Sequence, residues 1–174
     1  LLEKDNTLTG QTSVEAAVTS IFQSVTTRTA GYNTVDIGAL SSTVLIIMIF
    51  LMFVGASSGS TGGGIKTSTF ALIFLSAWST IRGKQQLEMF RHSISFDLLN
   101  KAFTIFLFSA TLVLVGTIFL TLTDPGINVL ALVFEEVSAF GTVGLSTGIT
   151  ASMSDTGKYI LILTMFIGRT GPLT

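Results

Sequence analysis

Residues 26–33, Thr-Thr-Arg-Thr-Ala-Gly-Tyr-Asn, are the stretch on which the fold depends. They lie between a short apolar segment and a longer one. A second stretch in the same kind of setting, residues 141–146, reads Gly-Thr-Val-Gly-Leu-Ser. With an offset of 113, Thr29–Gly31 aligns with Thr142–Gly144. One such stretch would be weak evidence, because glycine is common in ordinary turns. Its repetition predicts two copies of one structural unit.

The composition favours a membrane protein. The 174 residues are 48% hydrophobic and only 11% charged, whereas ordinary globular domains have about 25% charged residues. Mean hydropathy is +0.73. The absence of cysteine excludes disulfides and thiolate metal sites, and the net charge of −1 gives no reason to expect a nucleic-acid partner. Neither end resembles a natural terminus or a signal peptide, so we expect a part of a longer polypeptide.

The first unit begins with a short helix over about 13–25, whose apolar residues recur at helical spacing. Ser13 is the expected N-cap, with Glu15 in the first turn. Thirteen residues span roughly 20 Å, too little to cross a bilayer core of about 30 Å. A re-entrant half-helix fits better, and its C-terminal carbonyl dipoles would favour a cation beside residues 27–33.

A broken helix is expected over 40–81. Two uncharged runs, 40–54 and 67–81, are each too short to span a bilayer and together too long for one straight helix. The Gly/Ser-rich break from Gly55 to Gly64 separates them. Non-helical backbone at membrane depth is tolerated only where it is buried in protein or lines a cavity, so this break indicates an ion or substrate path.

The sequence of the break also resembles two other motifs. Gly59 to Thr67 resembles a phosphate-binding loop, which would indicate an ATPase, but Ile65 separates the required adjacent Gly64 and Lys66. The spacing of Gly55 and Gly59 also matches a helix-packing motif, which does not explain so long a run of small residues. We favour a flexible barrier in a pore.

The second unit repeats the order of the first. The connector 82–101 has the clearest basic excess outside the apolar segments, which places it in the cytoplasm. A full transmembrane helix follows over about 98–123, then a short helix over about 128–140, the loop 141–146 and the start of a last helix over 158–174. The expected fold is all-α and multi-pass transmembrane, built from repeated helix–pore helix–helix units that divide the chain into residues 1–92 and 93–174.

The two loops are candidate ion filters. Thr142–Leu145, Thr-Val-Gly-Leu, resembles the Thr-Val-Gly-Tyr strand of potassium channels, where backbone carbonyls replace the water shell of the ion. The expected ion-binding residues are Thr29, Ala30, Gly31, Tyr32, Thr142, Val143, Gly144 and Leu145. The expected gate comprises Gly55, Ala56, Ser57, Ser58, Gly59, Ser60, Thr61, Gly62, Gly63, Gly64, Lys66 and Arg169.

Other charged residues have supporting roles in this interpretation. Arg28 is a candidate donor to the carbonyls of its loop from behind. Glu135 and Glu136 are candidates either to attract cations near the mouth or to cap the short helix. No nucleophile, general base pair or metal centre is visible, so an enzyme is not expected.

The segments 27–33 and 59–67 together resemble the Trk/Ktr/HKT superfamily of potassium transporters, and the Ktr-type membrane subunit in particular. The resemblance implies four helix–pore helix–helix repeats around one pore. Residues 1–92 would be the third repeat without its first helix, and residues 93–174 the fourth, truncated.

The resemblance also implies site roles and partners. Gly31 and Gly144 would be the filter glycines associated with potassium preference, and Arg169 would lie near the gating loop. It further implies a plasma-membrane homodimer, filters toward the outside and a cytosolic ring of nucleotide-binding RCK-type regulatory subunits. K+ would be the transported ion, with Na+ as a candidate activator and no covalent cofactor. The alternative from another class is a non-conducting membrane scaffold packed through its Gly-rich helices.

Overall fold

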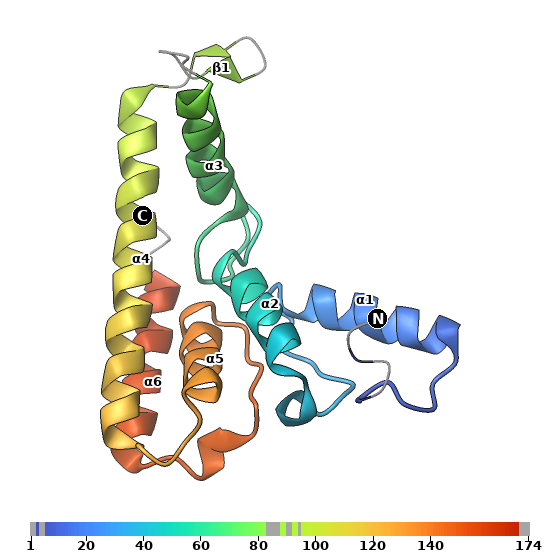
Figure 1. Cartoon of the computed structure of the whole chain (residues 1–174). Coiled ribbons are helices and arrows are strands. Elements are labelled where there is room, and N and C mark those ends of the chain that lie inside the picture. Colours follow the sequence, from blue (N-terminus) through green and yellow to red (C-terminus); the bar gives the residue numbers. More distant parts are fainter. Residues whose placement is uncertain (1–2, 4–5, 83–87, 90–91, 94, 171–174) are drawn as a thin grey trace.

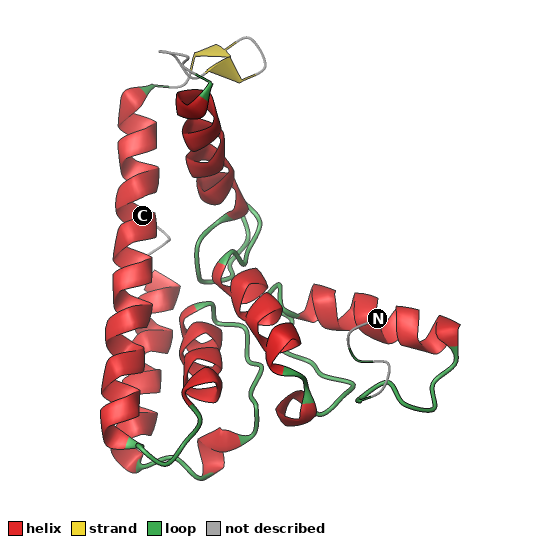
Figure 2. Ribbon diagram, viewed as in Figure 1, coloured by secondary structure: helices red, strands yellow, loops and turns green. Residues whose placement is uncertain are grey.

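The computed structural model describes the chain except for residues 1–2, 4–5, 83–87, 90–91, 94 and 171–174. Most of the described residues lie in helices joined by loops (Figure 2). In chain order the elements are α1 Ser13–Thr26, η1 Ile37–Ala39, α2 Ser42–Phe53, α3 Thr67–Ile81, β1 Glu88–Met89, β2 His92–Ser93, α4 Phe96–Thr123, α5 Val129–Phe140, η2 Ile149–Ala151 and α6 Asp155–Thr170.

The connector between α3 and α4 contains a small antiparallel pairing that the sequence analysis did not predict. Glu88 pairs with Ser93 and Met89 with His92. Strands of two residues are far shorter than the usual length of about five, so this is a local pairing rather than a sheet layer. The described fold is helical, as expected, apart from this hairpin.

Helix α1 begins at Ser13, as expected, but its N-cap is Thr12 and not Ser13. The Glu15 amide donates to Thr12 Oγ1 at 3.3 Å, and the Thr12 amide donates to Glu15 Oε2 at 2.8 Å. This reciprocal capping box stabilises the first turn. The helix projects sideways from the other helices, and its apolar residues Val14, Val18 and Ile21 are exposed (Figure 1).

Helices α2 and α3 are separated by non-helical backbone over residues 54–66. Two backbone hydrogen bonds close the base of this loop: the Ile65 amide donates to the Phe53 carbonyl at 3.3 Å, and the Thr67 amide to the Ala56 carbonyl at 3.1 Å. The ends of the loop are buried, whereas residues 57–61 at its tip are exposed. The loop is therefore anchored at both ends and open at its tip.

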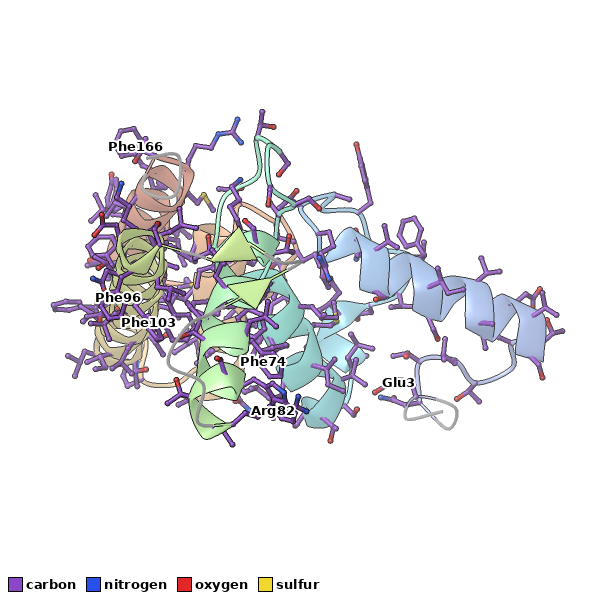
Figure 3. The ribbon with its side chains drawn as sticks, turned by 90° about the horizontal axis from the view of Figure 1, so that it is seen from above. Glu3, Phe74, Arg82, Phe96, Phe103 and Phe166 are labelled. Carbon is purple, nitrogen blue, oxygen red and sulfur yellow. The ribbon has the colours of Figure 1, made fainter. Side chains whose placement is uncertain are left out.

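Helix α4 is the one helix among the described residues that is long and apolar enough to cross a membrane. Its 28 residues span about 42 Å. Its most apolar window has a mean hydropathy of 2.4, yet only 17% of that window is buried inside the molecule. Phe96 and Phe103 of α4 and Phe166 of α6 are exposed on the same side of the molecule (Figure 3). Such an apolar outer surface suits lipid rather than water.

Helix α5 is the buried centre of the second unit, in contact with α2, α4 and α6. Every residue from Phe134 to Phe140 is buried.

Helix α6 begins at Asp155, earlier than the expected residue 158, because polar residues form its first turn. The Asp124 carboxylate accepts a hydrogen bond from the Ser154 amide at 2.7 Å, and Ser154 Oγ accepts one from the Gly157 amide at 3.1 Å.

Candidate functional site

The loops that follow α1 and α5 share one backbone conformation. Thr29 and Thr142 are the only non-glycine residues with positive φ among the described residues, at 71° and 51°. Two residues later Gly31 and Gly144 are also left-handed, with φ of 75° and 90°. Left-handed backbone is uncommon for a β-branched residue such as threonine and marks a constrained segment. The structure thus repeats the Thr-x-Gly pattern in its geometry as well as in its sequence.

The two loops lie against each other at their glycines. A Cβ atom built on Gly31 would lie 2.5 Å from the Val143 carbonyl oxygen, and one built on Gly144 would lie 3.6 Å from the Gly31 Cα. Two independent features therefore require a glycine at position 31: its positive φ and the close approach of a neighbouring backbone. The backbones of the two loops, which are far apart in the sequence, are thus in direct contact.

A hydroxyl in the last turns of each short helix holds the following loop. Thr26 Oγ1 donates to the Tyr32 carbonyl, and Ser138 Oγ donates to the Leu145 carbonyl at 2.6 Å. The backbone carbonyl of Thr26 also accepts the Ala30 amide at 3.2 Å, as that of Ser138 accepts the Val143 amide at 2.9 Å. The carbonyls of Tyr32 and Leu145 each have one lone pair engaged in this way, whereas no such hydroxyl contact occurs at Thr29–Gly31 or Thr142–Gly144 among the described residues.

The pairing of Thr26 with Ser138 corresponds to an offset of 112, while the loops align at 113. The same offset of 112 relates Gln23 to Glu135, and each of these side chains forms a hydrogen bond with the residue that follows its loop, Thr34 or Thr147. Gln23 Nε2 donates to Thr34 Oγ1 at 3.2 Å, and the Thr147 amide donates to Glu135 Oε1 at 2.8 Å. The second copy therefore has one more residue between its supporting hydroxyl and its loop: Thr26 precedes Thr29 by three positions, and Ser138 precedes Thr142 by four.

Glu135 is buried and hydrogen-bonded to the segment after its loop, and does not lie exposed at the mouth of a pore. It is 5% exposed, and its carboxylate accepts hydrogen bonds from the hydroxyls of Ser146 at 2.7 Å, Thr147 at 3.1 Å and Thr150 at 3.2 Å. A carboxylate with several donors fixes the segment that leaves the loop. Glu136, its neighbour, is fully buried on a different side of α5.

The Gly-rich segment lies directly against both loops. A Cβ on Gly62 would lie 3.0 Å from the side-chain oxygen of Thr29, and one on Gly63 would lie 2.9 Å from that of Thr142. The Gly63 amide donates to Thr142 Oγ1 at 2.8 Å. Only residues without side chains fit this approach, which explains two consecutive glycines here. The structure brings one part of the expected gate together with one threonine of each expected filter.

Charged residues hold the Gly-rich segment from two sides. Lys66 Nζ donates to the carbonyls of Ser60 at 2.9 Å and Gly62 at 2.6 Å. Arg28 Nη1 donates to the Gly55 carbonyl at 3.4 Å, so it contacts the Gly-rich segment and not the carbonyls of its own loop as the sequence indicated. Arg169 is exposed in the last turn of α6. Its neighbour Gly168 approaches the same segment: a Cβ on Gly63 would lie 2.9 Å from the Gly168 carbonyl oxygen.

Sequence reasoning missed the residues that support the two loops. Gln23, Thr26, Glu135 and Ser138 had no assigned role of this kind. A pattern that could have found them is present in each copy: Gln or Glu followed three residues later by Thr or Ser, near the end of the short helix. It is not apparent at the 113 offset because the supporting residues align at 112.

The architecture defines a class of protein. In both copies a short helix is followed by a loop that contains left-handed backbone and then by a further helix, and the backbone carbonyls of such loops are the kind of ligand that ion filters use. The family description "TrkH: Cation transport protein" matches residues 1–174. The chain belongs to this family of cation transport proteins.

Individual relatives agree with this assignment. The chain is 42% identical over 176 residues to "Ktr system potassium uptake protein B" of Vibrio alginolyticus, covering 100% of this chain and 38% of the relative. It is 44% identical over 155 residues to the Bacillus subtilis (strain 168) protein of the same name, covering 89% of this chain and 35% of the relative. It is 38% identical over 173 residues to "Potassium/sodium uptake protein NtpJ" of Enterococcus hirae, covering 97% and 38%.

A solved structure shows the same fold. The crystal structure of the potassium transporter TrkH from Vibrio parahaemolyticus superposes with a TM-score of 0.77 at 21% identity, covering 93% of this chain and 36% of that one. At this identity the likeness concerns the fold alone. The chain therefore spans little more than a third of the length of the relatives that it matches.

Proposed function

We propose that this chain contributes part of a potassium uptake path across the plasma membrane. Dehydrated ions meet the backbone carbonyls of Thr29–Tyr32 and Thr142–Leu145, and the Gly-rich segment 55–64 controls passage beyond them. The observation that carries the proposal is the contact of Gly62 with Thr29 and of Gly63 with Thr142, because one segment reaches both loops at once. The potassium uptake named for the 42% and 44% identical relatives supports K+ as the ion.

The carbonyls of Thr29–Gly31 and Thr142–Gly144 are the principal ligands in this proposal. The carbonyls of Tyr32 and Leu145 contribute less to ion binding, because each already accepts a hydrogen bond from a hydroxyl. Lys66, which donates to two carbonyls of the Gly-rich segment, stabilises the closed arrangement. This path involves no covalent chemistry, and the function proposed for the chain is transport rather than catalysis.

The arrangement in the membrane follows from charge and length. The connector 82–101 faces the cytoplasm and the two filter loops face the outside, in line with the tendency of basic connectors to stay inside. Residues 1–92 and 93–174 are two of four repeats in a multi-pass protein. The resemblance to Ktr-type subunits supports a homodimer that binds a cytosolic RCK-type ring, with Na+ as an activator; co-purification with such a ring and the mass of the complex test this.

The deciding experiment is Rb+ uptake into liposomes that contain the full-length protein. A deletion of Gly59–Gly64 removes the residues that contact Thr29 and Thr142, so uptake should rise at least several-fold. Retention of a trapped dye serves as the control for intact vesicles. If the folded protein takes up no Rb+ and the deletion impairs only its assembly, the non-conducting scaffold is the better description.

A further inference from the structure

Glu136 is a buried carboxyl that contacts three helices. It lies on α5 and has no exposed surface. Its Oε1 atom accepts a hydrogen bond from Thr164 Oγ1 of α6 at 2.9 Å. On the α4 side it occupies the space that Gly116 leaves free, since a Cβ there would lie 1.9 Å from Oε1. One side chain thus fills the junction of α4, α5 and α6.

This placement lowers the stability of the fold. The Oε2 atom has no hydrogen-bond partner among the described residues. Burying an incompletely paired carboxyl is unfavourable, and an apolar side chain would fill the same space at lower cost. An ionisable residue at membrane depth is for this reason a candidate for function. The transport path proposed above does not include Glu136.

The contacts on either side of Glu136 lead to the two parts of the proposed path. On α6, Thr164 and Gly168 are four residues apart and share one helix face. Gly168 lies against the carbonyl of Phe140 and approaches Gly63 of the Gly-rich segment. On α5, Ser138 follows Glu136 closely and holds the Leu145 carbonyl. The Glu136–Thr164 hydrogen bond joins the helix that carries one loop to the helix whose end faces the gate.

We propose that Glu136 is a positioning residue whose hydrogen bond to Thr164 fixes the register of α5 against α6. A fixed register keeps the loop 142–145 at a constant position relative to the Gly-rich segment, and so sets the affinity and selectivity for the transported cation. The inference rests on the proposed function, because it concerns how tightly that path binds its ion.

The test compares full-length variants in liposomes by the concentration dependence of Rb+ uptake and its inhibition by Na+. Thr164→Val and Glu136→Leu remove the hydrogen bond and should each raise the apparent KM for Rb+ about three- to ten-fold, as expected for one hydrogen bond. Their combination should have no larger effect than either alone. Glu136→Gln keeps an oxygen acceptor of the same reach and should restore the wild-type KM.

Thr121→Val is the matched control, because among the described residues the Thr121 hydroxyl on α4 donates to the Thr117 carbonyl of its own helix and to no other helix. An unchanged KM and Na+ inhibition in Thr164→Val, or an equal change in Thr121→Val, would overturn the inference while leaving the proposed function intact. A maximal rate that falls with the amount of folded protein, at constant KM, would also overturn it. A wild-type protein without Rb+ uptake would overturn the proposed function and this inference with it.

Discussion

At the scale of single residues, Gly31 and Gly144 occupy corresponding loop positions in unequal surroundings. Both have positive φ, but of the two only Gly31 lies so close to another backbone that a side chain is excluded. A Cβ built on Gly31 would lie 2.5 Å from the Val143 oxygen, whereas the atom nearest to a Cβ built on Gly144 would be 3.6 Å away. The first loop is thus the more sterically constrained of the two. A substitution series can separate backbone strain, steric overlap and ion selection.

We predict that Gly31→Ser lowers both thermal stability and the preference for K+ over Na+, whereas Gly144→Ser lowers the preference with a smaller loss of stability. Left-handed backbone costs a non-glycine residue about 1–2 kcal/mol at either site. Gly148→Ser is the control for this strain, because Gly148 has φ of 89° with nothing within 4 Å of its Cβ position. Rb+ uptake in competition with Na+, and thermal unfolding, measure the two effects. An unchanged preference in both filter variants would show that these loops do not select the ion.

The hydroxyl of Ser138 should contribute measurably to stability. Ser138→Ala leaves the Leu145 carbonyl without its 2.6 Å donor in a buried site, which should cost about 1 kcal/mol in the free energy of unfolding. Ser152→Ala removes a comparable 2.8 Å hydroxyl–carbonyl bond at the surface and should cost less than about 0.5 kcal/mol. Equal unfolding temperatures for the two variants would contradict a supporting role for Ser138.

At the scale of elements, the sequence predicts a helix well where its pattern is local. Helix α4 follows from a long uncharged run, and α1 from apolar residues at helical spacing. The N-cap of α1 and the start of α6 are less well predicted, because polar caps and not apolar periodicity decide them: Thr12 pairs with Glu15, and Ser154 with Asp124. The hairpin in the connector gave no periodic pattern at all.

The same distinction applies to the site. The loops and the Gly-rich segment are visible as local composition, so the candidate residues could be named. Their contacts could not, because the approach of Gly62 to Thr29 and of Gly63 to Thr142 depends on tertiary packing between distant segments. The supporting hydroxyls of Thr26 and Ser138 were missed for the same reason. The spacing of Gln or Glu three residues before Thr or Ser marks these helix ends in both copies, but the carbonyl that each hydroxyl contacts depends on where the loop returns.

The link between α4 and α6 should depend on pH through Asp124. Hydrogen bonds from the Ser154 amide, and then from its hydroxyl, hold the pKa of the Asp124 carboxyl below its ordinary value of 3.8 despite the opposing effect of burial. A lowered pKa means that the carboxylate stabilises the fold above that ordinary value, and that this stabilisation is lost as pH falls through the folded-state pKa. Asp124→Asn should therefore be less stable than wild type at neutral pH, with the difference shrinking on acidification. Thermal unfolding of both proteins across this range is the measurement; a constant difference would contradict the role of the carboxylate.

At the scale of the whole molecule, α1 differs from its counterpart α5 in how much of it is covered. Val14 and Ile21 of α1 are 73% and 64% exposed, whereas Phe134 and Val137 of α5 are 0% and 2% exposed. In the second unit, α4 packs against the short helix α5. In the first unit, an apolar groove of about 570 Å³ lies between the short helix α1 and α2. The two units have the same loops but unequal packing around them, in keeping with a chain that spans little more than a third of its relatives.

The proposed orientation makes the ends of α4 accessible from opposite sides of the membrane. Because this chain has no cysteine, single cysteines can be introduced in a full-length protein whose other cysteines have been replaced. Gly126→Cys lies in the turn after α4 with nothing within 4 Å of its Cβ position, and Ser95→Cys lies before α4 at an exposed N-cap without a side-chain cap bond. A membrane-impermeant maleimide added to intact cells should label Gly126→Cys, and should label Ser95→Cys only after the cells are opened. The reverse pattern would place the filter loops in the cytoplasm. Labelling of both cysteines in intact cells would mean that α4 does not span the membrane, and would contradict the multi-pass arrangement itself.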